Sequence, residues 1–211
     1  ASKVYKKFLA SCPAPDAPGS KQVAALMTIT GLIDAPKADK EFLSINGAQG
    51  FSTFYGYYML EAMATAGNYQ GALDVIREYW GAMIDLGATS FWEDFDINWI
   101  PNATPIDELV PEGKKDIHGD CGAYCYVGFR HSLCHGWASG PTSWLSRHIL
   151  GVEVIEPGCR QVRITPHLGD LQWVKGTFPT PYGEIQIYHE KQANGNVISE
   201  VKAPKGVSVI K

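Results

Sequence analysis

The sequence predicts an α+β protein in which a helical part precedes an antiparallel β part. Up to about residue 150, apolar residues recur mainly at intervals of three and four, which is typical of amphipathic helices. After Gly151 the interval falls to two, and short alternating segments are separated by turn residues, which indicates antiparallel strands. We therefore place a domain boundary at Gly151, with one domain over residues 1–151 and a second over residues 152–211.

About five helices are expected in the first domain. Ser20 is a candidate N-cap, and Asp34 to Pro36 should stop the helix that it opens. Two long patterns are separated only by Gly67 and Asn68, which predicts an antiparallel helical hairpin. The helical segments that we expect cover residues 20–33, 39–45, 51–66, 69–86 and 132–150, and residues 3–10 are a short helix or the tail of one.

Six strands are expected in the second domain. Asn194-Gly195 is a strong hairpin signal between two of them. About sixty residues bury little surface, so we expect this domain to pack on the helical part. Trp173 is either part of that contact or buried wholly inside the β domain. The expected strands cover residues 152–155, 162–165, 171–174, 184–188, 197–201 and 207–210.

Charge and composition exclude some classes of protein. The chain has 211 residues and a net charge of -4 without a basic stripe, so we expect no nucleic-acid partner. Its apolar runs are far shorter than a membrane span. Residues 1–20 contain no apolar core of a signal peptide. The protein is therefore expected in the cytoplasm or, if a leader has been removed or lies outside this sequence, in the periplasm or medium.

The cysteines invite a zinc interpretation. Five cysteines are an odd number, which does not suit a disulfide framework. Three cysteines and two histidines form a C-x3-C-x5-H-x2-C-H pattern over residues 121–135, which is not a usual structural zinc spacing. Reduced, partly buried cysteines are the favoured interpretation, and we expect no metal and no cofactor.

The segment with the clearest chemistry is G-A-T-S-F-W-E-D-F over residues 87–95. It places Glu93 beside Trp92 in a run of aromatic rings, at the start of a long irregular stretch over residues 87–131. Such surroundings can suit a carboxylate to proton transfer near neutral pH, and aromatic rings bind the C–H faces of sugars. Phe51 and Tyr55, near a helix start, could face the same pocket. The alternative is a surface acid with core aromatics beside it, and core packing for Phe51 and Tyr55.

Four stretches together resemble the C-terminal portion of bacterial α-L-rhamnosidases of glycoside hydrolase family 78. Residues 87–93 resemble the family's G-A-T-T-x-W-E, and residues 132–145 resemble its S-x-N-H…W-L segment. Residues 152–166 resemble the link into the last β-domain, and residues 176–183 resemble that domain's own signature. Asn precedes the histidine in the family, whereas Cys134 precedes it here, and the spacing from Glu93 to His135 is longer than expected.

The resemblance implies part of an (α/α)6 barrel over residues 1–151, an antiparallel β-sandwich over 152–211, and inverting hydrolysis of terminal α-L-rhamnosides. It implies Glu93 as the general base and His135 as a sugar contact. We take Trp92 and Trp137 as further candidates for substrate binding. The general acid has no counterpart here, so the missing N-terminal part of the same polypeptide is the expected partner. A carbohydrate-binding module using Trp92, Trp99 and Trp137, or an inactive structural piece, are the alternatives.

Overall fold

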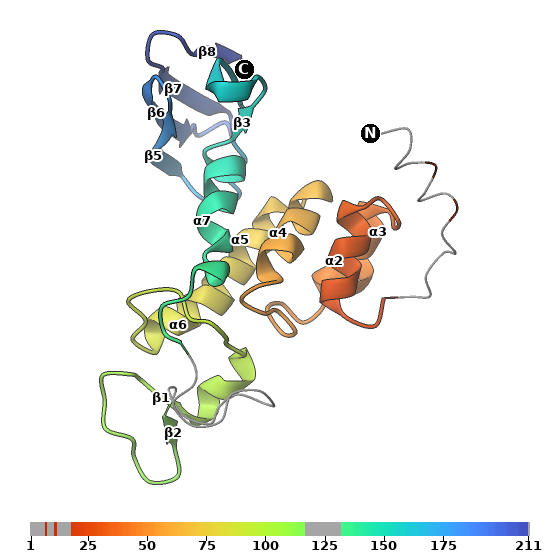
Figure 1. Ribbon diagram of the computed structural model, residues 1–211, viewed down its shortest axis with the longest axis vertical. Helices are drawn as coiled ribbons and strands as arrows, with labels where there is room; N and C mark the ends of the chain where they lie inside the picture. The colour runs from red at the N-terminus through yellow and green to blue at the C-terminus, as the bar shows by residue number, and fades with distance from the viewer. Residues whose placement is uncertain (1–6, 8–10, 12–17, 117–131, 211) are drawn as a thin grey trace. The chain divides into compact units, whose positions relative to one another are not determined.

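The computed structural model describes residues 7, 11, 18–116 and 132–210, which form a mixture of helices and largely antiparallel sheets (Figure 1). The α+β class is thus confirmed. The chain divides into two compact units, an N-terminal unit (Ala1–Ala138) and a C-terminal unit (Ser139–Lys211). Of the helix expected over residues 3–10, only Lys7 is described, and it is helical; Cys121, Cys125 and His131 of the cysteine pattern lie outside the described residues.

The first described helix of the N-terminal unit is α2 (Lys21–Ile29), and Ser20 caps it as expected by accepting from the Val23 amide at 3.3 Å. Helix α2 ends at Ile29, before the predicted stop at residues 34–36, and these residues instead open α3 (Ala35–Ala38), which continues as the π-helical turn η1 (Asp39–Leu43). The Asp34 carboxylate accepts from the Lys37 amide at 3.1 Å. Pro36 lies in the first turn, where a helix needs no amide donor.

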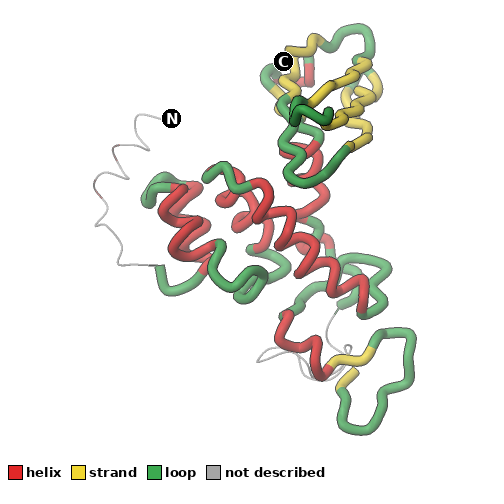
Figure 2. The backbone as a smooth tube through the Cα atoms, turned by 180° about the vertical axis from the view of Figure 1, so that it is seen from behind, coloured by secondary structure: helices red, strands yellow, loops and turns green. Residues whose placement is uncertain are grey.

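The predicted helical pair is present, and Figure 2 shows it as adjoining red segments. It consists of α4 (Gly56–Thr65) and a continuous run of α5 (Tyr69–Val75), η2 (Ile76–Trp80) and α6 (Gly81–Asp85). The Asn68 side chain accepts from the Gly71 amide at 2.9 Å and so caps α5. The first helix starts at Gly56 rather than at residue 51, and residues 53–55 form a turn before it.

From residue 87 on, the described residues of the N-terminal unit are mostly irregular, as expected. It contains the 3-10 turn η3 (Ile97–Asn102), the two-residue parallel strands β1 (Ala103–Thr104) and β2 (Lys115–Asp116), and η4 (Gly136–Ala138). The helix expected over 132–150 begins only at residue 140, as α7 (Gly140–Trp144) and η5 (Leu145–Ile149).

All six expected strands of the C-terminal unit are present. One sheet has the order β3 (Val152–Val154), β4 (Gln161–Ile164), β8 (Ser208–Ile210), with β8 parallel to β4, and the short turn η6 (Pro157–Cys159) connects β3 to β4. The other is antiparallel, in the order β5 (Trp173–Thr180), β6 (Gly183–Lys191), β7 (Val197–Lys202). Strand β5 runs six residues past its expected end because Pro179 lies on an edge strand, where its missing amide is tolerated.

Both sheets share one core with the end of the preceding helix. Leu150 is buried there, and its carbonyl lies 3.1 Å from Nε2 of the fully buried His189, whose Nδ1 lies 2.7 Å from the Ser199 hydroxyl. Trp173 is 61% exposed, so the option of burial inside the β domain is wrong. The core residues are Leu150, Val152, Val162, Ile164, Ile185 and Ile187.

The C-terminal unit should lose stability at acidic pH through His167. Burial, followed by the nearby imidazole of His148, lowers the pKa of His167 below 6.5. The unfolded chain therefore binds a proton before the folded chain does, and stability falls as the pH drops through about 6.5. We expect His167→Gln to flatten the dependence of the melting temperature on pH between 7.5 and 5. Parallel curves for the variant and the wild type would contradict this, and His135→Gln in the other unit is the control.

Candidate functional site

A sharp reversal after α6 sets the position of the segment that carries Glu93. Gly87 has a φ of +90°, which favours glycine, and its amide donates to the Ile84 carbonyl at 2.9 Å. A Cβ at this position would lie 2.9 Å from the Ile106 side chain. Ile106 is itself fixed, because its amide donates to the Leu86 carbonyl at 3.0 Å. Residues 88–93 therefore leave the helix in a set direction.

Residues 90–93 pair with residues 132–135, although about forty residues separate them. The Glu93 amide donates to the Ser132 carbonyl at 2.8 Å, and the His135 amide donates to the Phe91 carbonyl at 2.7 Å. The Ser90 hydroxyl also donates to the Leu133 carbonyl. This pairing explains why residues 132–135 are not helical, and it brings the two motifs of the sequence together.

The backbone and the side chain of Glu93 are both held in place. Its carbonyl accepts from the Thr53 hydroxyl at 2.5 Å and from the Trp137 indole at 2.6 Å. Its carboxylate oxygen Oε2 accepts from the Ser132 amide at 3.0 Å and lies 4.0 Å from Nδ1 of His135. The Glu93 side chain is 15% exposed and that of His135 is 32% exposed. A mostly buried carboxylate thus adjoins an accessible imidazole.

An exposed group of aromatic rings adjoins this pair. The ring centroids of His135 and Trp137 are 4.2 Å apart, and those of Trp137 and Phe54 are 5.7 Å apart. Phe54 in turn contacts Tyr55 at 5.0 Å. Phe54, Tyr55 and Trp137 are all exposed, with 44% of Trp137 accessible. The three rings can therefore offer apolar faces to a ligand beside Glu93.

Two predicted site residues lie in the core instead. Trp92 is 0% exposed and packs edge-on against the buried Phe95 at 5.9 Å. Phe51 is also buried, where it contacts Tyr79 and lies under the Lys21 ammonium group at 5.1 Å. Successive residues in an extended segment point to opposite faces, which explains why the ring of Trp92 turns away from the side chain of Glu93 and into the core. Neither ring offers a face to a ligand in this structure.

Phe54 and Thr53 were not identified from the sequence. Both were assigned to a helix over residues 51–66, which would place Phe54 on its packed face. Because the helix begins at Gly56, Thr53 instead reaches the Glu93 carbonyl and Phe54 reaches Trp137. A Cβ on Gly56 would lie 2.7 Å from the Trp80 ring, so this glycine permits the close approach that fixes the turn. The unusual density of aromatic and hydroxyl residues over 51–58 was the available signal.

The arrangement has the parts of a proton-transfer site with a stacking surface. A fixed carboxylate beside an imidazole can accept a proton from a water or a hydroxyl group within hydrogen-bond reach. The adjoining rings can orient a ligand that has both apolar faces and hydroxyl groups. Among the described residues, no group of three or more histidine, cysteine, aspartate or glutamate side chains could hold a metal ion. In the described part of the chain, no helix is long and apolar enough to cross a membrane.

A family model and several solved structures that are similar to this chain both name rhamnosidases. Residues 151–210 match the family model described as bacterial alpha-L-rhamnosidase C-terminal domain. No curated protein matches the sequence. Solved structures do, and the chain spans about a fifth of their length.

Three of these solved structures are described as rhamnosidases. A GH78 family rhamnosidase of Bacillus sp. GL1 is 26% identical, with 90% of this chain and 18% of that chain covered and a TM-score of 0.68. An α-L-rhamnosidase from Aspergillus terreus is 20% identical, with 99% and 24% covered and a TM-score of 0.73. The α-L-rhamnosidase of Streptomyces avermitilis, solved with L-rhamnose, is 17% identical, with 99% and 20% covered and a TM-score of 0.70. The chain as a whole therefore resembles the C-terminal portion of family 78 α-L-rhamnosidases, and its residues 151–210 match the model of the bacterial alpha-L-rhamnosidase C-terminal domain.

Proposed function

We propose that this chain is the C-terminal part of a glycoside hydrolase that removes terminal α-L-rhamnose with inversion, and that Glu93 is its general base. The observation that carries the proposal is the fixed position of the Glu93 carboxylate, 4.0 Å from His135 and bonded to the Ser132 amide. His135 would contact the sugar, and Trp137 and Tyr55, with Phe54, would bind its apolar face.

An inverting site also needs a general acid, with the two carboxyl groups roughly 6.5–9.5 Å apart. The carboxylates close to Glu93 in sequence accept hydrogen bonds from nearby backbone amides. Asp94 accepts from the Phe95 amide at 2.9 Å, and Asp96 accepts from the Asn98 amide at 2.9 Å. We therefore place the acid in the missing N-terminal part of the same polypeptide. The described helices would then complete an (α/α)6 barrel with that part, and the two sheets that share a core would form its β-sandwich.

The exposed aromatic rings favour one alternative, a non-catalytic carbohydrate-binding fragment. Phe54, Tyr55 and Trp137 would bind a sugar in that case as well, since stacking needs no general acid. The two functions differ in whether the carboxylate of Glu93 matters for turnover or only for affinity.

The test compares the 211-residue chain with the full-length polypeptide that contains it, on an aryl α-L-rhamnoside. We expect the full-length polypeptide to release β-L-rhamnose first, as proton NMR of the fresh product would show, and the 211-residue chain to be inactive. Retention of the anomeric configuration would contradict the inverting mechanism. Hydrolysis by the 211-residue chain, abolished by Glu93→Gln, would show that the acid lies within it, with Glu108 and Glu112 as the first candidates.

A further inference from the structure

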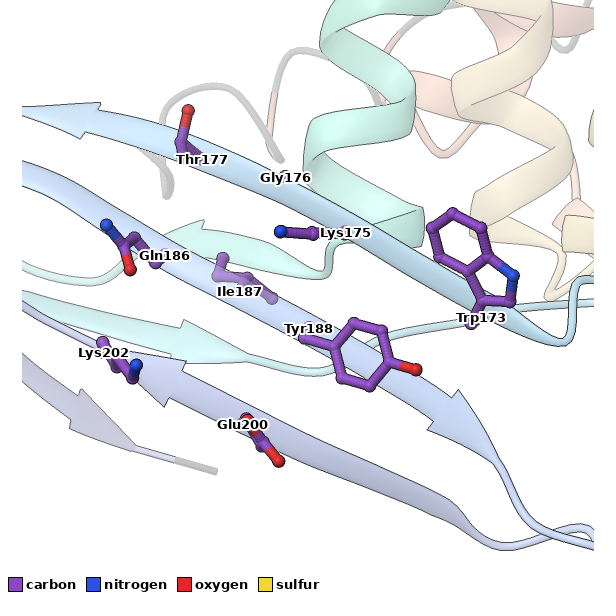
Figure 3. A pocket seen from close by; sticks show the side chains of 9 residues that line it. All are labelled: Trp173, Lys175, Gly176, Thr177, Gln186, Ile187, Tyr188, Glu200 and Lys202. Carbon is purple, nitrogen blue, oxygen red and sulfur yellow. The ribbon is translucent and has the colours of Figure 1, made fainter.

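The second sheet of the C-terminal unit has an outward face that the proposed function does not use. Along β6 the inward side chains Ile185, Ile187 and His189 are buried, so Gln186, Tyr188 and Glu190 belong to the opposite face. An open cavity of about 860 Å³ lies over this face (Figure 3). Its lining residues are Trp173, Lys175, Gly176, Thr177, Gln186, Ile187, Tyr188, Glu200 and Lys202.

The strand register arranges the outward side chains in three rows across the sheet. One row is Thr177–Gln186–Lys202, the next is Lys175–Tyr188–Glu200, and the third is Trp173–Glu190–Ile198. Aromatic rings thus occupy diagonal positions on neighbouring strands, and hydrogen-bonding groups surround them. Figure 3 shows the Trp173 and Tyr188 rings on adjacent strands of this cavity.

The backbone that carries the aromatic part of the face is fixed before any ligand arrives. Trp173 pairs with Glu190 at the start of β5, and the Lys191 amide donates to the Gln172 carbonyl at 2.8 Å. Partial burial, together with the charges of Glu190 and Glu200, raises the pKa of Tyr188, so the phenol stays protonated as a donor. A face with little freedom to lose binds at a lower entropic cost.

We propose that this face is a second saccharide-binding site, which takes a neutral sugar chain stacked on Trp173 and Tyr188. A 61% exposed indole offers an apolar surface to the C–H face of a pyranose ring, and Gln186, Glu200 and Lys202 lie within the same cavity to meet hydroxyl groups.

The distribution of charge selects this kind of occupant. Lys175 and Lys202 are balanced by Glu190 and Glu200, which favours a neutral ligand over an acidic one. The central parts of protein–protein interfaces are depleted in lysine and glutamate, whereas here these residues alternate with the aromatic rings. The β5 strand from Trp173 to Thr177 is roughly 13 Å long, which accommodates more than one sugar ring. The site uses only residues of the C-terminal unit, so it does not depend on the Glu93 proposal.

The experiment is a titration of the 211-residue chain carrying Trp137→Ala, which removes stacking at the candidate active site. Maltotriose, cellotriose and methyl α-L-rhamnopyranoside are the neutral probes, and trigalacturonic acid is the acidic probe. Saturation-transfer NMR and calorimetry give the dissociation constants. We expect at least one neutral probe to bind with a constant on the order of millimolar. Adding Trp173→Ala should weaken this binding at least tenfold, whereas Tyr182→Ala, an exposed ring outside the cavity, should leave it unchanged.

Four results would overturn the proposal. They are the absence of binding by every neutral probe, binding that Trp173→Ala does not change, binding of the acidic probe alone, and equal losses with Trp173→Ala and Tyr182→Ala. Repeating the titration on the full-length polypeptide decides whether the face is accessible there. Saccharide binding that responds to Trp173→Ala supports the site, and a Trp173 ring shielded from acrylamide quenching would assign the face to a contact with the rest of the polypeptide instead.

Discussion

Replacing Glu93 by glutamine in the full-length polypeptide should lower kcat on an aryl α-L-rhamnoside by a factor on the order of 10² to 10⁴, with little change in sugar binding. Glutamine keeps the shape of the side chain and an oxygen that can accept from the Ser132 amide. Thr53 and Trp137 bind the backbone carbonyl of residue 93, which the substitution does not alter. Only the ability to take a proton from water is removed.

The matched control is Asp96→Asn. This change removes a carboxylate three residues away, and asparagine can still cap the η3 turn by accepting from the Asn98 amide. We expect near-normal turnover in this variant. Near-normal turnover in Glu93→Gln would rule out the general-base assignment. A comparable loss in both variants would mean that the segment tolerates no change, and that the Glu93 result reports structure rather than chemistry.

Much of the fold was predictable because the hydrophobic period changes at one place. The change at Gly151 separated helices from strands correctly, and Ser20 and Asn194-Gly195 marked real boundaries. The boundaries of helices and strands were misplaced where the same residue type is common in two kinds of local structure. Asp34 and Pro36 suit a helix start as well as a helix end. Strand β5 extends through Pro179, which an edge position tolerates, and the sequence alone does not reveal that position.

The candidate site was only partly predictable, since it depends on pairing between distant segments. The motifs around Glu93 and His135 drew attention to both residues, but only the pairing of residues 90–93 with 132–135 brings them within 4.0 Å. The rings next to Glu93 in sequence are not those next to it in space. Trp92 turns into the core, whereas Phe54 and Trp137 supply the accessible aromatic surface. Neighbours in an extended segment face opposite sides, so sequence proximity misassigned the aromatic surface.

The structure also bears on how the β domain holds together. The sequence places a boundary at Gly151, yet the compact C-terminal unit begins at Ser139 and includes α7 and η5. Leu150 belongs to the core of both sheets, and a Cβ on Gly176 of β5 would lie 2.7 Å from its Cδ1. The Gly151 carbonyl accepts from the Thr165 amide at 2.9 Å. The end of the helix is therefore part of the β core rather than a connection to it.

We accordingly expect residues 152–211 alone to show no cooperative thermal transition, whereas residues 139–211 should melt cooperatively. The shorter piece lacks Leu150, and loss of a buried leucine side chain typically costs about 2–5 kcal/mol. It also leaves Nε2 of the fully buried His189 without the Leu150 carbonyl, and an unpaired buried polar group costs about 1–3 kcal/mol more. The free energy of unfolding of a small domain lies near the low end of about 5–15 kcal/mol. The combined loss is therefore nearly as large as the total stability of the domain.

A point substitution separates the leucine from the length of the chain. Leu150→Ala in the 211-residue chain should lower the temperature at which the β strands unfold. Hydrogen exchange of the strand amides measures this temperature. Leu109→Ala should not, because that side chain is 95% exposed. If residues 152–211 melt cooperatively at the temperature of the longer piece, the β domain is independent, and the helix end contributes nothing essential to its core. If both pieces lack a transition while the 211-residue chain has one, the β domain also needs contacts from residues before 139.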